Sequence, residues 1–296
     1  MPKPRPPDPG TQVAWSPASG RKELEACLRR LGGQPDAEIA LAEAALWLAA
    51  LDRPRVGLER YHHHLSLLAR DTADYALEHG AAESLGGRIA ALNAAIRERH
   101  GYRGDRRTYD DLQNANLMRV IDRRKGLPVA LGILYIHAAR AQGWLIEGLN
   151  FPGHFLLRLE LGAERAILDP FEDGALREAR DLRDILRRVA GHGSDLRPEH
   201  TAAVSNRDIL LRLRNNIKQR LLRDQKTQDA LAVLESMLMV APDRAQHWLE
   251  AGMLHAHLGN LRAAIMALEN VLELGASSTE MHQAAQLLQG LKTRLN

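Results

Sequence analysis

Hydrophobic positions recur at helical spacing over most of the chain, and the spacing changes twice. From residue 21 to residue 100, apolar side chains return every three or four positions, which is typical of helices with one buried face. Gly32-Gly33 interrupts this pattern early, and Asp36 is a plausible N-cap for the helix that follows. We therefore predict an N-terminal helical region over residues 21–100.

A segment of mixed character follows over residues 101–175. Pro128 opens an apolar helix that runs to about Gln142, and Gly143 ends it. Short extended segments then follow at 144–149, 154–161 and 166–168. Their length and spacing predict a small antiparallel sheet that packs on the Pro128 helix, with His154 and Asp169 on consecutive strands.

The last third contains an internal repeat. The apolar pattern of Ala230–Glu235 returns at Ala264–Glu269, an offset of 34 residues. This is the period of tetratricopeptide helix pairs, and further helices are expected at 208–222 and 279–295. We predict a tetratricopeptide repeat region over 206–296.

These patterns together predict an α+β fold that is mostly helical. Residues 1–20 are rich in proline, which removes backbone donors and stiffens the chain, so we expect a disordered tail. A core domain is expected over 21–200, helical in 21–100 and mixed in 101–175, before the repeats at 206–296.

Composition excludes several classes of protein. The chain has 45% hydrophobic and 26% charged residues, which is typical of globular proteins. Its net charge is only +3, and the basic residues between 106 and 125 show no repeated interleaving with aromatics that would suggest base stacking, so no nucleic-acid partner is expected. No apolar run approaches the roughly 18 residues of a membrane span, and no secretory signal is visible. We expect a cytoplasmic protein without a membrane partner.

The sequence also gives no sign of a metal or cofactor. The single cysteine, Cys27, excludes an internal disulfide and a cysteine-rich metal site. His62, His63 and His64 are adjacent, and neighbours on a helix point about 100° apart, so they cannot all reach one ion. We predict no cofactor and no metal.

The central segment carries short motifs in a defined order. They are Gly101-Tyr102-Arg103-Gly104, Arg123-Arg124-Lys125-Gly126-Leu127-Pro128, Phe151-Pro152-Gly153-His154-Phe155 and Leu168-Asp169-Pro170-Phe171. With the C-terminal repeats, this order closely resembles the SirB family of bacterial proteins. One departure is Met118, which stands where the resemblance suggests a second asparagine after Asn114.

The resemblance implies a transglutaminase-like, papain-like core with a cysteine, histidine and aspartate triad. His154 and Asp169 match the histidine and aspartate positions. The cysteine of such cores opens the helix that ends at Gly143, and counting back about 15 residues gives Pro128. Proline has no nucleophilic atom, and no serine or threonine occurs between residues 125 and 190.

Two interpretations of the His154 and Asp169 pair remain open. The two side chains either bond to each other and stabilise a turn, or they belong to a vestigial catalytic site that binds a ligand. Tyr135 is either a core residue of the Pro128 helix or part of that site. Five candidate binding residues accompany the pair: Asn114, Asn116, Arg123, Arg124 and Tyr135.

Three functions fit these observations. The first is a non-catalytic pseudoenzyme that binds a protein or peptide through its core and the groove of its tetratricopeptide helices. The second is an acyl-transfer enzyme or peptide hydrolase that uses His154 and Asp169 with an unrecognised nucleophile. The third is a structural scaffold that assembles without a ligand.

Overall fold

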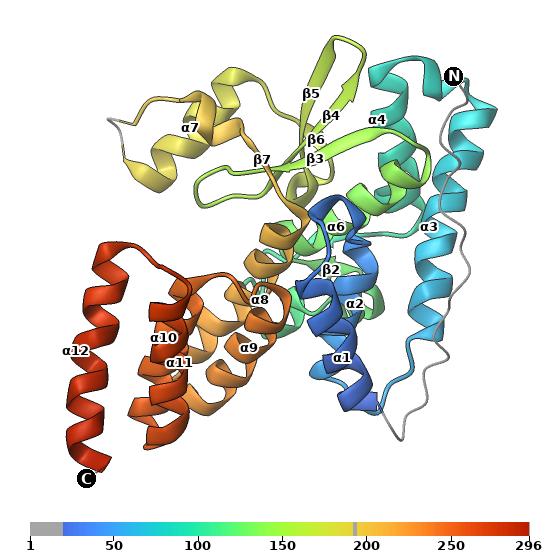
Figure 1. The fold of residues 1–296 in the computed structure, drawn as a ribbon. Coiled ribbons are helices and arrows are strands. Elements are labelled where there is room, and N and C mark those ends of the chain that lie inside the picture. The colour runs from blue at the N-terminus through green and yellow to red at the C-terminus, as the bar shows by residue number, and fades with distance from the viewer. Residues whose placement is uncertain (1–19, 192–193, 296) are drawn as a thin grey trace, which may run out of the picture.

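The computed structural model describes residues 20–191 and 194–295. The predicted tail at 1–20 lies outside the described residues, apart from Gly20, which begins the first helix. Within the described ranges the chain is mostly helical, with one small antiparallel sheet, as predicted (Figure 1). No helix there is both long enough and apolar enough to cross a bilayer.

The predicted N-terminal helical region is confirmed. It contains four helices, and the last continues into a π-helical segment at Ala94–Arg99. The helices are α1 (Gly20–Gly32), α2 (Leu41–Leu51), α3 (Glu59–Glu78) and α4 (Leu85–Asn93). Almost every side chain of α2 is buried, because α2 lies between other helices instead of at the surface.

The mixed segment forms a five-stranded antiparallel sheet in the order β6-β5-β4-β3-β7. Its strands are β3 (Leu145–Leu149), β4 (Leu156–Leu161), β5 (Glu164–Asp169), β6 (Ala175–Leu176) and β7 (Ala203–Val204). A separate parallel pair joins β1 (Arg103–Gly104) to β2 (Lys125–Gly126). The helices of this segment are α5 (Leu117–Arg123), α6 (Pro128–Ala141) and α7 (Ala179–Ala190).

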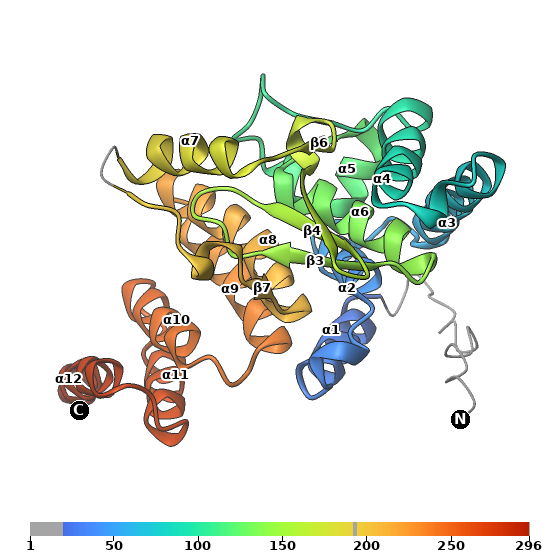
Figure 2. The same ribbon diagram turned by 90° about the horizontal axis from the view of Figure 1, so that it is seen from above.

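The sheet packs on α6, as the sequence predicted (Figures 1 and 2). Gly132 of α6 permits this close approach. A Cβ atom at Gly132 would lie 2.4 Å from Cε1 of Phe155, the residue that precedes β4. The helix itself begins at Pro128, whose fixed φ suits the first helical position, and ends before Gly143, which has a φ of +72°.

The C-terminal helices confirm the repeat. They are α8 (Asn206–Arg223), α9 (Thr227–Val240), α10 (Ala245–His257), α11 (Leu261–Glu273) and α12 (Ser278–Leu295). The starts of α9 and α11 are 34 residues apart, so α9–α10 and α11–α12 are successive helix pairs. Figure 1 shows these pairs stacked away from the sheet.

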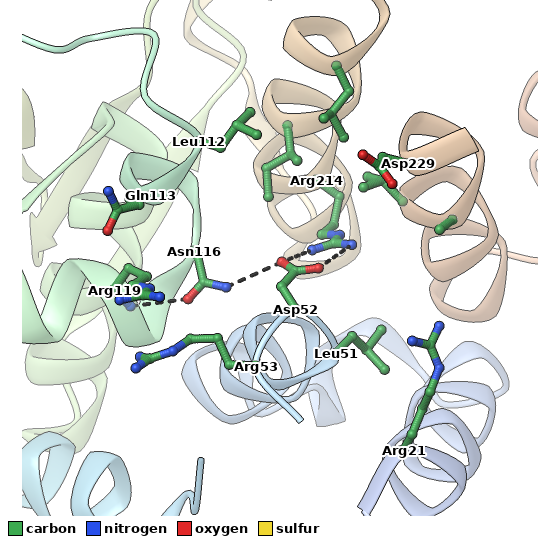
Figure 3. Close-up of a pocket in the computed structure, with 14 residues that line it drawn as sticks. Arg21, Leu51, Asp52, Arg53, Leu112, Gln113, Asn116, Arg119, Arg214 and Asp229 are labelled. Carbon is green, nitrogen blue, oxygen red and sulfur yellow. Dashed lines mark hydrogen bonds and ion pairs between the residues drawn. The ribbon is translucent and has the colours of Figure 1, made fainter. Parts of the chain in front are cut away.

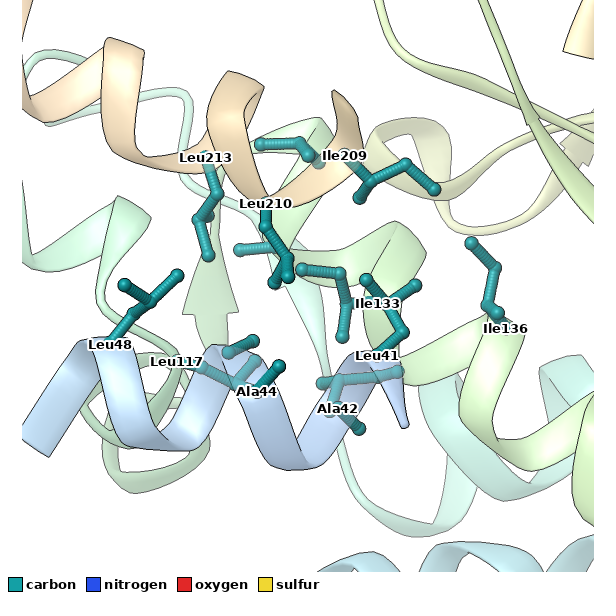
Figure 4. Close-up of a cluster of buried hydrophobic side chains, with 14 of the residues drawn as sticks. Leu41, Ala42, Ala44, Leu48, Leu117, Ile133, Ile136, Ile209, Leu210 and Leu213 are labelled. Carbon is teal, nitrogen blue, oxygen red and sulfur yellow. The ribbon is translucent and has the colours of Figure 1, made fainter. Parts of the chain in front are cut away.

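One hydrophobic core joins the N-terminal helices to the repeats. Figure 4 shows α2, α6 and α8 meeting through Leu48, Ile133 and Leu210. The helix α1 packs on α9, and both views show them side by side (Figures 1 and 2). Gly32 permits this contact, because a Cβ there would lie 2.4 Å from the Met239 carbonyl oxygen.

The expected N-cap role of Asp36 is wrong. The helix α2 begins five residues later, at Leu41. The Asp36 carboxylate instead accepts the backbone N–H groups of Asn206 and Arg207, each at 2.9 Å, in the first turn of α8. An acid at a helix N-terminus accepts hydrogen bonds from backbone N–H groups that lack a partner within the helix, and its negative charge interacts favourably with the helix dipole. Here the helix begins 170 residues further along the chain.

Candidate functional site

His154 lies in the turn between β3 and β4 and precedes the strand on which it was predicted, since β4 begins at Leu156. Pro152 and Gly153 form this turn, and the φ of +67° at Gly153 explains why glycine stands there. The His154 side chain is 20% exposed, so the ring is accessible from solvent while its other side meets the sheet.

Asp169 ends β5 and holds the His154 ring. The Asp169 Oδ2 atom lies 2.9 Å from His154 Nε2, so the two side chains are hydrogen-bonded to each other. The same oxygen accepts from Nε and Nη2 of Arg177 at 3.2 and 3.0 Å. Oδ1 accepts the backbone N–H groups of Phe171 and Glu172 at 3.1 and 3.2 Å. The carboxylate is 1% exposed and has donors on both oxygens.

The electrostatics of this pair show which ring nitrogen donates a proton to the carboxylate. Burial alone would raise the pKa of Asp169, but the hydrogen bonds and positive charges of His154 and Arg177 lower it below its ordinary value. An ionised carboxylate only accepts, so His154 Nε2 carries the proton. In the neutral ring Nδ1 is then an acceptor. This arrangement suits a group that takes a proton from a nucleophile.

The nucleophile position supplies no such group. Pro128 is the buried first residue of α6. Contacts connect the pair to this helix: Phe155, next to His154, packs on Gly132, and Phe171 approaches Gly104. The strand β1 that contains Gly104 pairs with β2, which directly precedes α6.

The other predicted site residues have internal partners, and of these the Tyr135 hydroxyl comes near the turn that follows Asp169. Asn114 donates to the Thr108 carbonyl at 2.6 Å and accepts from Arg123 at 2.9 Å. Arg123 also pairs with the buried Asp105 at 2.9 Å. These contacts stabilise the loop before α5.

Asn116 and Arg124 lie at the two ends of α5, and the Tyr135 hydroxyl lies beside Gly174, in the turn after Asp169. Asn116 caps α5 by accepting the Arg119 N–H at 3.1 Å, and it donates to the Ala49 carbonyl at 2.9 Å. Arg124 ends α5 with a φ of +58° and contacts the Tyr102 ring. Tyr135 is a core residue of α6 that donates to Asn93 at 3.0 Å. Met118, the departure from the family pattern, is fully buried.

Two arginines at the site were not predicted from the sequence. Arg177 pairs with Asp169, and Arg212 of α8 donates to the carbonyl oxygen of His154 at 2.6 Å. Arg212 also lies over the Phe155 ring at 5.5 Å, and burial lowers its pKa. Neither arginine belongs to a motif: Arg177 directly follows β6, the strand that pairs with β5, and Arg212 reaches the site from α8.

Arg212 also lines a groove between the core and the repeats. The groove has a volume of about 980 Å³. The turn Asn150–Gly153 forms one wall, and residues of α8 and α10, including Gln219 and His247, form the other. Within residues 20–191 and 194–295, no group of three or more metal-ligating side chains is suitably placed to hold an ion.

Comparisons with known proteins agree with the geometry. Residues 59–215 match the transglutaminase-like superfamily, and residues 217–289 match the tetratricopeptide repeat. A UPF0162 protein of Vibrio cholerae is 32% identical over 234 residues, which cover 79% of this chain and 85% of that protein. A UPF0162 protein of Pseudomonas aeruginosa is 30% identical over 269 residues, covering 89% of this chain and 94% of that one.

A more distant similarity is found in mammals. Human F-box only protein 21 is 29% identical over 176 residues, which cover 58% of this chain and 28% of that protein. No solved structure matches the chain.

Proposed function

Because this chain belongs to the transglutaminase-like superfamily, alongside the UPF0162 proteins, we propose that it is a non-catalytic protein-binding module of the cytoplasm. Its site would be the groove between the Asn150–Gly153 turn and helices α8 and α10. The observation that carries this proposal is that the transglutaminase-like core and the tetratricopeptide helices both contribute walls to one groove. Stacked helix pairs commonly bind partners on such concave surfaces.

The absence of a nucleophile supports a binding role over catalysis. In a cysteine, histidine and aspartate triad, the thiolate forms the covalent intermediate. Pro128 has no atom that forms this intermediate, and its buried position exposes nothing to a substrate. The retained pair of His154 and Asp169 then serves to hold the Pro152–Gly153 turn at the edge of the groove.

The polar groups of the groove suit a peptide main chain. Lys218 pairs with Glu250, and Arg244 pairs with Asp208 at 2.7 Å, so these charges are compensated within the protein. With these charges compensated, the groove suits the uncharged main chain of a peptide.

Site-specific photo-crosslinking in the native cytoplasm tests the proposal with the full chain. A photoreactive residue replaces Gln219 in the groove, and a matched variant carries it at the exposed Gln289 on α12. We expect a discrete crosslinked protein at position 219 that is absent at position 289. Identical crosslinking patterns at both positions would contradict a groove-bound partner.

A second candidate function is acyl transfer or peptide hydrolysis. The orientation of the His154 ring by a buried carboxylate favours it. The reaction would need a nucleophile outside the Pro128 position or an activated water. If the unmodified chain hydrolyses an amide substrate and the His154→Ala variant does not, this alternative is supported and the non-catalytic proposal is contradicted.

A further inference from the structure

A second cavity, separate from the groove, lies where the N-terminal helices meet the repeats. Its volume is about 330 Å³, at the small end of the range for ligand pockets. Residues from α1, α2, α5, α8 and α9 line it, so the cavity exists only when these distant parts of the chain are assembled (Figure 3).

The floor of this pocket is rigid and electrically neutral. Arg214 is buried and pairs with Asp52 at 2.8 Å, while its Nε donates to Ser236 at 3.0 Å. Asn116 donates to the same Asp52 carboxylate at 3.3 Å (Figure 3). A buried and bonded pair of this kind positions the walls but has no net charge to offer a ligand.

Most other charges around the pocket are compensated too. Arg21 pairs with Glu25 at 3.0 Å, and Arg53 pairs with Asp122 at 2.8 Å. Two charged side chains remain without an ion-pair partner among the described residues: Arg119 on α5 and Asp229 on α9. Figure 3 shows them on opposite sides of the pocket.

Between these two opposite charges, apolar side chains flank the compensated Asp52–Arg214 pair and Asn116 (Figure 3). The apolar side chains are those of Leu51, Leu112, Ile217, Leu221, Ala232 and Val233. A ligand that satisfies both ends therefore has an anionic group, a cationic group and a hydrophobic body. Guanidinium groups bind carboxylates with well-directed hydrogen bonds, and a carboxylate accepts equally well from an ammonium group.

We propose that this pocket binds a small zwitterion with an apolar body, an apolar amino acid or a short apolar peptide, whose carboxylate meets Arg119 and whose ammonium meets Asp229. Asp229 also lies in the first turn of α9, where any acid favours the helix dipole. A purely local role of Asp229 at the helix N-terminus would not explain the unpaired Arg119 on the opposite side of the pocket. It would also predict that the modified and unmodified ligands bind equally.

Calorimetric titration of the full chain with leucine, Leu-Leu and Leu-Leu-Leu tests the proposal. An extended residue spans about 3.3–3.6 Å, so the tightest binder reports the separation of the two charges and distinguishes a free amino acid from a peptide. The tightest binder is then compared with its N-acetylated and C-amidated forms. We expect each modification to weaken binding by about fivefold, the upper value for an exposed ion pair.

Two variants assign the ends of the ligand. In Arg119→Met, the C-amidated ligand should bind as well as the unmodified one, while the N-acetylated ligand should still bind more weakly. In Asp229→Asn, the N-acetylated ligand should bind as well as the unmodified one, while the C-amidated ligand should still bind more weakly. The exposed, unpaired residues Arg262 and Asp74 provide matched controls, because Arg262→Met and Asp74→Asn remove the same charges elsewhere. No saturable binding by any of the three ligands, equal binding of the modified forms, or the same effect from the control variants would overturn the proposal.

Discussion

Replacing Asp169 with asparagine removes the charge that orients His154, and its cost can be worked out from the contacts. Asparagine Oδ1 can still accept the backbone N–H groups of Phe171 and Glu172. The new NH₂ group, however, faces the donors of Arg177, which keeps its charge without a partner. Breaking a buried pair in this way typically costs about 3–5 kcal/mol. The Arg177 side chain is 22% exposed and can rehydrate, so we expect a loss of about 2–3 kcal/mol at pH 7.

The pH dependence of this loss has a definite sign. The pKa of Asp169 is lowered from 3.8 by folding, so its contribution is fully present above about pH 4 and disappears as the pH falls through the folded pKa. Urea unfolding of both proteins, followed by the fluorescence of the chain's tryptophans, measures the difference from pH 7 to pH 3. A difference below about 1 kcal/mol at pH 7, or one that does not shrink in acid, would refute this reasoning.

Two further substitutions test the packing and the buried histidine. Gly132→Ala should destabilise the chain by about 1–3 kcal/mol, because the new methyl group collides with the buried Phe155 ring. The control Gly290→Ala in α12, where the Cβ meets open space, should stabilise the chain by up to about 1 kcal/mol. Thermal unfolding of both variants and the unmodified chain measures these differences. His64 is buried, and this burial, together with the nearby charge of Arg124, lowers its pKa to about 4. As the pH falls, the histidine therefore takes up a proton in the unfolded state before it does so in the folded state. Stability should decrease by about 2–3 kcal/mol between pH 6.5 and 4, and His64→Gln should remove most of that decrease in urea unfolding.

Local signals in the sequence predicted most of the architecture. The 34-residue offset located the helix pairs, and Pro128 and Gly143 gave the ends of α6 within two residues. The strands β6 and β7 were missed, because two residues are too few to show alternation. The helix α7 was also not predicted.

Long-range contacts explain the remaining differences. Gly32 looks like a simple helix break, yet its missing side chain lets α1 pack on the Met239 carbonyl of α9. Asp36 resembles a local cap, but its carboxylate binds the start of α8. At the candidate site, family motifs indicated His154 and Asp169, whereas Arg212, which binds the His154 carbonyl, comes from α8, 58 residues further along the chain. Such partners depend on tertiary assembly, which local sequence patterns do not encode.

The central claim is that this transglutaminase-like chain binds a partner and does not catalyse acyl transfer. The most direct test measures amide hydrolysis and amine incorporation by the unmodified full chain, side by side with His154→Ala. The account predicts no turnover above the background rate and no difference between the two proteins, since Pro128 supplies no nucleophile. Clear turnover by the unmodified chain, abolished in His154→Ala, would contradict it.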